Sequence, residues 1–140
     1  MRIRNVKEFI IDRSQWLPWE AQRGGSALRL TGSYGKTADG RTRMCCLGIY
    51  LNKCGVPKDT LNGYVMPREL PLKIVAKIPS WLSDDDDTAG DLANVNDTAN
   101  FAIRKGERRI DAREKKIKAL FKKQGVKVKF IGKLFPKKPK

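Results

Sequence analysis

Three segments of the chain have the pattern of apolar and polar positions that is typical of β-strands. Residues 9–11 (Phe-Ile-Ile) form a short apolar run, as a buried strand does. Residues 26–44 begin with alternating apolar and polar positions and contain an Asp-Gly turn signal, which predicts two short strands around a Gly-rich connection. Residues 126–130 alternate Val, Lys, Val, Lys and Phe, which predicts a strand with one buried face.

Two further segments have the period of a helix. Between Met44 and Cys54 the apolar side chains recur at the spacing of a buried helical stripe, and Gly55 follows as a left-handed C-cap. Residues 107–124 form the clearest helix, with apolar side chains on one side and Lys or Arg around the rest, and Gly125 ends it. These elements predict the α+β class, with short antiparallel strands and two main helices.

The predicted domain organisation is simple. Residues 1–132 are expected to form a small single domain that ends in a basic helix and a strand, because this length is sufficient to bury a core. Residues 133–140 contain four lysines and two prolines, which predicts a flexible, disordered basic tail.

No apolar run approaches the roughly 18–20 residues that a membrane span requires. The basic N-terminus is not followed by the apolar region of a secretory signal. Three cysteines cannot all pair, which favours reduced thiols. We therefore expect a cytoplasmic protein without membrane contact.

Three short blocks resemble a known group. They are a Trp-containing N-terminal segment, the Met44–Gly48 block (Met-Cys-Cys-Leu-Gly) that closes with Cys54-Gly55, and the 92–97 segment (Leu-Ala-Asn-Val-Asn-Asp). The chain resembles, over about residues 9–131, small uncharacterised proteins of tailed bacteriophages and prophages. The resemblance implies no activity. It implies a setting, that of a phage accessory protein in the cytoplasm of its bacterial host.

The positive charge of the chain is concentrated at one end. Between Phe101 and Lys140, sixteen Lys or Arg stand against three acidic residues, a net charge of +13, whereas the first hundred residues carry a net +2. Such a field attracts polyanions over a Debye length of about 8–10 Å. Six aspartates between Asp84 and Asp97 form an acidic stretch that can fold against the basic helix and mask part of this charge.

The candidate catalytic and metal sites all fail on residue type or spacing. The 32–37 segment lacks the first glycine of a phosphate-binding loop, and the aspartate run lacks two ligands of a calcium loop. There is no histidine to serve as a metal ligand or as a base for Cys45 or Cys46. We therefore expect no enzymatic activity, no cofactor and no metal, with a thiol enzyme as the one exception left open.

The charge pattern predicts binding to nucleic acid or to a nucleoprotein assembly, without sequence-specific readout, because no known reading motif is present. Interference with host machinery or defence suits the phage setting. The predicted binding residues are the cations of the last helix and strand: Arg108, Arg109, Lys115, Lys116, Lys118, Lys122, Lys123, Lys127 and Lys129.

Two alternatives remain open. A virion structural role is one, and a protein–protein inhibitor of a host bacterial enzyme is the other. Tryptophan is enriched at binding hot spots, although a core position is its default. The candidate partner-binding residues of such an inhibitor are the first two tryptophans and the aspartate run: Trp16, Trp19, Asp84, Asp85, Asp86 and Asp87.

Overall fold

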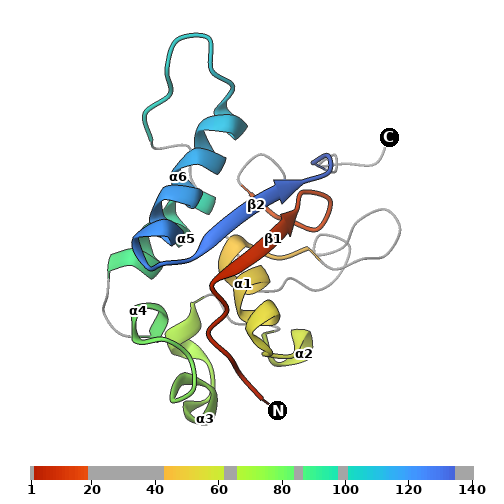
Figure 1. Cartoon of the computed structure of the whole chain (residues 1–140), viewed down its shortest axis with the longest axis vertical. Helices are drawn as coiled ribbons and strands as arrows, with labels where there is room; N and C mark the ends of the chain where they lie inside the picture. Colours follow the sequence, from red (N-terminus) through yellow and green to blue (C-terminus); the bar gives the residue numbers. More distant parts are fainter. Residues whose placement is uncertain (1, 19–42, 62–65, 84–86, 98–100, 135–140) are drawn as a thin grey trace.

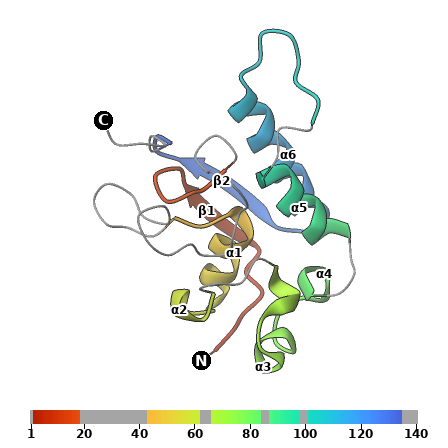
Figure 2. The ribbon, with the colours of Figure 1, turned by 180° about the vertical axis from the view of Figure 1, so that it is seen from behind.

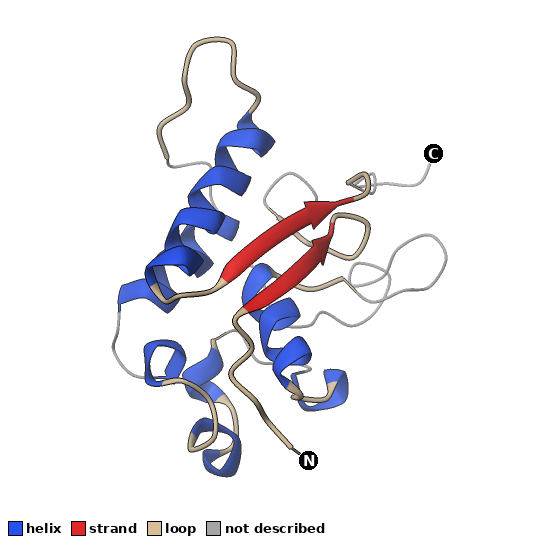
Figure 3. Cartoon of the chain, viewed as in Figure 1, coloured by secondary structure: helices blue, strands red, loops and turns tan. Residues whose placement is uncertain are grey.

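A computed structural model describes residues 2–18, 43–61, 66–83, 87–97 and 101–134 (Figure 1). Two strands from distant parts of the chain lie side by side, and the intervening helices pack around them (Figure 3). The elements in chain order are β1 (Glu8–Asp12), α1 (Cys46–Cys54), α2 (Lys58–Leu61), the 3-10 helix η3 (Pro67–Glu69), α3 (Leu72–Val75), α4 (Ser80–Ser83), α5 (Asp87–Asp97), α6 (Arg109–Lys123) and β2 (Lys127–Ile131).

The two strands are parallel, so the prediction of antiparallel strands is wrong. In the register, Glu8 lies opposite Lys127 and Asp12 lies opposite Ile131. Antiparallel strands suit a short hairpin, whereas parallel strands need a long crossover. Here the crossover contains all the helices, and both arrows point the same way in Figure 1. Among the described residues, the chain is also richer in helices than the two main ones expected, although the α+β class holds.

The predicted strands at residues 9–11 and 126–130 are confirmed within one or two residues. Burial alternates along both strands, so that Phe9, Ile11, Val128 and Phe130 face the core. The two strands predicted within residues 26–44 lie almost entirely outside the described residues. Met44, at their end, forms an isolated parallel bridge with Trp16.

The predicted helix that ends at Cys54 is confirmed as α1, and its stripe of apolar side chains is buried. Gly55 caps it in the left-handed conformation, with φ 116°. A Cβ atom at this position would also collide with the backbone carbonyl of Arg2. Both its conformation and its surroundings therefore require glycine.

An aromatic cluster joins the sheet to the helices. Phe9 of β1 contacts Tyr50 of α1 and Phe121 of α6, each with ring centroids 5.0 Å apart. Trp81 of α4 packs on Tyr50 and Phe121 at 5.7 and 5.9 Å. The helices α1 and α6 thus cover the same face of the sheet. The side chains on the other face are charged residues and isoleucines.

Candidate nucleic-acid interface

The helix α6 separates its apolar side chains from its cations. Ile117, Leu120 and Phe121 are buried against the core. The helical period places the exposed cations in two rows along the opposite side, since positions three, four or seven residues apart share a face. The first row contains Lys115, Lys118 and Lys122, and the second contains Arg109, Lys116 and Lys123.

The first row continues onto the sheet. The chain turns after α6 at Gly125, which has φ 75°, and enters β2 directly. The strand exposes Lys127 and Lys129 on its outer face, and the ammonium of Lys118 lies 5.8 Å from the centroid of the Phe130 ring. Because α6 and β2 run side by side (Figure 1), these cations border the same strand, with Lys118 beside the core-facing ring of Phe130 and Lys127 and Lys129 on the outer face. We call the four cations around β2 the basic face: Lys118, Lys122, Lys127 and Lys129.

All three carboxylates of the C-terminal segment pair with a cation. Glu107 accepts from Lys115 at 2.7 Å, and this hydrogen bond holds the pKa of Glu107 below its usual value. Asp111 accepts from Arg108 at 2.9 Å, which lowers the pKa of Asp111 in the same way. Two predicted phosphate-binding residues, Arg108 and Lys115, are therefore already engaged within the molecule.

The third carboxylate, that of Glu114, binds a cation at the junction of the two strands and α6. Glu114, which is nearly buried, accepts two hydrogen bonds of 2.7 Å from Arg13, which follows β1. Arg13 also donates to the carbonyl oxygen of Gly132, just after β2. This pair fixes the ends of the strands, and Glu114 lines the same hollow as Lys118 of the basic face.

The other predicted cations are exposed. Among the residues that the structure describes, none of them forms an ion pair. They are Arg109, Lys116, Lys118, Lys122, Lys123, Lys127 and Lys129. Four of them border β2 as the basic face, and three lie along the second row of α6.

The acidic stretch lies partly beside the second row. Its residues from Asp87 onward form α5, which packs along α6 (Figure 2). Asp91 and Lys116 line the same hollow. Asp84, Asp85 and Asp86 lie outside the described residues. The expected masking thus affects the second row of α6, whereas α5 lies away from the basic face.

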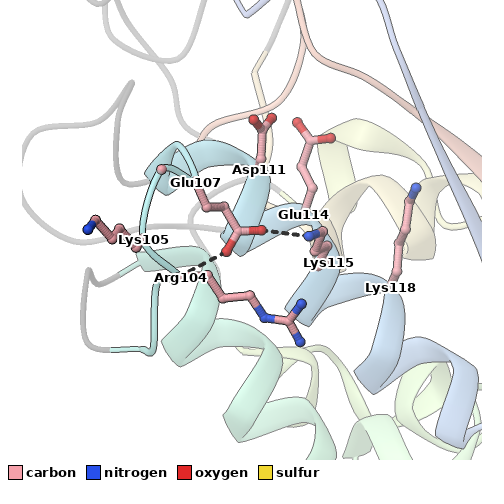
Figure 4. A pocket seen from close by; sticks show the side chains of 8 residues that line it. Arg104, Lys105, Glu107, Asp111, Glu114, Lys115 and Lys118 are labelled. Carbon is pink, nitrogen blue, oxygen red and sulfur yellow. Dashed lines mark hydrogen bonds and ion pairs between the residues drawn. The ribbon is translucent and has the colours of Figure 1, made fainter.

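A hollow of about 570 Å³ between the 101–107 loop and α6 has mixed charge (Figure 4). Glu107 lies at its centre, where it accepts from Lys115 and from the backbone N–H of Arg104. The four cations of its lining face three carboxylates. They are Arg104, Lys105, Lys115 and Lys118, against Glu107, Asp111 and Glu114. This balance makes the hollow a weak site for phosphate.

Of the protein-partner candidates, the structure describes the side chain of Trp16 alone. Trp16 is completely buried, so an exposed anchor at this position is wrong. Its large ring fills the core beside Phe130, at 5.0 Å between centroids, and its indole N–H donates to Asn96. Trp19 lies outside the described residues, and Asp87 is the first residue of α5.

The three cysteines are all buried and unpaired with one another. Burial raises the pKa of the Cys46 thiol well above its usual value. The nucleophilic form of cysteine is the thiolate, and an apolar environment disfavours it. Within the part of the chain that the structure describes, no cluster of cysteine and acidic side chains has the form of a metal site. Likewise, no described helix is long and apolar enough to cross a membrane.

The three blocks that carry the phage resemblance meet at Asn96. Its side-chain oxygen accepts from the Trp16 indole at 2.8 Å and from the backbone N–H of Cys46 at 3.1 Å, and its amide donates to the carbonyl of Leu17. Asn96 thereby caps the N-terminus of α1, where Cys45 supplies no side-chain cap. The blocks hold the fold together, and sequence reasoning missed this role.

No family model, no curated protein and no solved structure matches this chain.

Proposed function

We propose that this protein binds nucleic acid, alone or within a nucleoprotein assembly, through the basic face and without catalysing a reaction. One observation supports it most. The carboxylates of the C-terminal segment pair with Arg13, Arg108 and Lys115, and the cations of the basic face are exposed and form no ion pair among the described residues. Contacts of lysine with phosphate release counterions and supply affinity without regard to base sequence.

The spacing of these cations suits a phosphate backbone. Lys118 and Lys122 lie one helical turn apart, about 6 Å along the axis of α6. Lys127 and Lys129 lie about 6.6 Å apart along β2 and point the same way. A pair from each element gives four point charges that neutralise phosphates, without the planar fork that arginine uses to read guanine.

The setting belongs to the same proposal. A phage accessory protein in the bacterial cytoplasm would use this face against host nucleic acid or its machinery. An inhibitor of a host protein is the alternative, and no contact among the described residues favours it now that Trp16 is assigned to the core.

The test is a salt titration of binding to a labelled oligonucleotide, measured by fluorescence anisotropy. If four phosphates are contacted, log K should fall against log salt with a slope of about −3 to −4. Lys118→Glu, Lys122→Glu and Lys129→Glu combined should abolish most binding. The matched control reverses three exposed lysines on α2, on α3 and after it, Lys58, Lys73 and Lys77, with the same change in net charge.

The control variant should retain near-wild-type affinity, since its charges lie away from the basic face. Equal loss in both variants would show that only net charge matters and would contradict a localised interface. Binding that hardly responds to salt would contradict phosphate contacts, and no binding to the oligonucleotide would favour the protein-inhibitor alternative.

A further inference from the structure

A second hollow, of about 790 Å³, lies between α5, the 101–107 loop and α6. Its apolar lining includes Phe101, Ala112 and Ala119, and the small alanines of α6 leave room for a flat group. Its rim carries Arg104, Lys116 and Asp91. The hollow thus combines an aromatic ring, cations and a carboxylate within one concave site.

Phe101 has a position unlike that of the other described phenylalanines. Phe9, Phe121 and Phe130 belong to the core cluster, whereas Phe101 is only partly buried and is not packed against that cluster. The guanidinium carbon of Arg113 lies 4.7 Å from the centroid of the Phe101 ring. Arg113 is itself fully buried and donates to the backbone carbonyl of Val95. A buried cation therefore supports the ring, which lines the hollow.

The end of the loop that carries Phe101 is held by hydrogen bonds within the molecule. Glu107 accepts from the backbone N–H of Arg104 and from the Lys115 ammonium, and its own N–H donates to the carbonyl of Arg104. Gly106, with φ 82°, makes the tight turn that this requires. Binding here would thus cost little ordering of the loop.

These groups match the parts of an unpaired nucleotide. A phenylalanine ring can stack on any base, lysine and arginine contact the phosphates, and an aspartate accepts from an exocyclic amino group. We propose that this hollow holds an unpaired base, so that the nucleic acid bound by this protein is single-stranded. In a duplex the bases are stacked inside and cannot enter it. The inference rests on the proposed function and names its substrate class.

The second row of α6 supplies the path for the flanking backbone. Lys116 lies at the rim of the hollow, with Arg109 and Lys123 seven residues to either side, about 10 Å each along the helix axis. A strand that enters the hollow would follow this row, and the carboxylates of α5 beside it would weaken the purely electrostatic part of binding there. Stacking on Phe101 would offset this weakness.

The experiment compares a fluorescent single strand with bases, the same strand made abasic, which has equal length and charge, and a duplex of the same length. Wild-type protein should bind the strand with bases about 5- to 100-fold more tightly than the abasic strand, the range expected for stacking of one base. Phe101→Leu should remove this difference and leave abasic binding unchanged. Phe101→Tyr should keep it. Circular dichroism and thermal melting establish that both variants fold.

Equal binding of the strand with bases and the abasic strand by wild-type protein would overturn this inference and leave the proposed function standing. If the folded Phe101→Leu variant still preferred the strand with bases over the abasic strand, this result would also overturn the inference. Since the wild-type comparison needs no variant, a failure of Phe101→Leu to fold does not remove the test. Binding of no probe at all, or binding only to anionic lipid vesicles through the neighbouring exposed Ile103, would overturn both proposals.

Discussion

The indole nitrogen of Trp16 donates a 2.8 Å hydrogen bond to the side-chain oxygen of Asn96, and both side chains are completely buried. A buried polar group stabilises a fold only when its hydrogen bonds are satisfied. Here the side-chain amide of Asn96 accepts from the Trp16 indole and from the backbone N–H at the start of α1. It also donates to the carbonyl of Leu17. The N-terminal segment, α1 and α5 therefore share a single polar contact in the core.

Asn96→Ala should destabilise the protein by about 3 kcal/mol, because it leaves several buried donors and acceptors without partners. The measurement is urea denaturation followed by circular dichroism. Asp91→Asn, on an exposed position of the same helix, is the control and should cost less than about 1 kcal/mol. A loss below about 1 kcal/mol for Asn96→Ala would show that the network does not hold the segments together.

Two glycine substitutions should change the free energy of unfolding in opposite directions. Gly55→Ala places a Cβ in a left-handed conformation and against the carbonyl of Arg2, so it should destabilise the protein by about 2 kcal/mol or more. Gly90→Ala lies on α5 with open space around it, and it should stabilise the protein by about 0.5–1 kcal/mol. The same denaturation experiment measures both, and equal signs would contradict the geometry.

The free energy of unfolding should fall in acid partly through Glu107 and Asp111. Hydrogen bonds from Lys115 and Arg108 lower the pKa of these carboxyls in the folded state. Their stabilising contribution is therefore complete above about pH 5 and is lost as the pH falls through the lowered pKa values. The urea midpoint, measured between about pH 6 and 3, should decline less steeply in the double variant Glu107→Gln, Asp111→Asn.

The control for this pH profile is Glu8→Gln, which removes an exposed carboxylate of the outer sheet face. Its midpoint should follow that of the wild type. A double variant with an unchanged profile would show that the two ion pairs do not form in solution.

The thiols should be inert in the folded protein. All three are buried, and burial raises the pKa of Cys46, so a disulfide reagent at about pH 8 should react only as fast as the protein unfolds. Three thiols should then react together in denaturant. A native thiol that reacts faster than free cysteine would instead favour the thiol enzyme.

Local patterns in the sequence predicted the positions of individual strands and helices. The strand at Phe9, the helix ending at Gly55 and the long basic helix are all where period and capping signals place them. Strand direction could not be predicted, because it depends on which segments meet in space. A hairpin turn directly between two strands indicates that they pair in antiparallel fashion. No comparable local signal in the sequence indicates that two distant strands pair in parallel.

The sequence predicted which cations belong to the candidate site, but it did not predict which of them are engaged in ion pairs. The cations of α6 and β2 follow directly from the charge pattern, but pairing determines which of them remain available. The Arg108–Asp111 pair has the three-residue spacing that signals a helical ion pair, so this one was open to prediction. The burial of Trp16 agrees with the core position that is the default for tryptophan, whereas the partial exposure of Phe101 could not be predicted, since it depends on contacts with distant helices.

The pairing of β1 with β2 also constrains how the molecule can be made. The partners in this sheet are more than a hundred residues apart, so β1 leaves the ribosome long before β2 exists. During synthesis the apolar side chains of β1 must stay uncovered or be shielded by other proteins. The slow step of folding should therefore be closure of this longest loop, and a chain that stops before Lys127 should leave β1 without its partner strand.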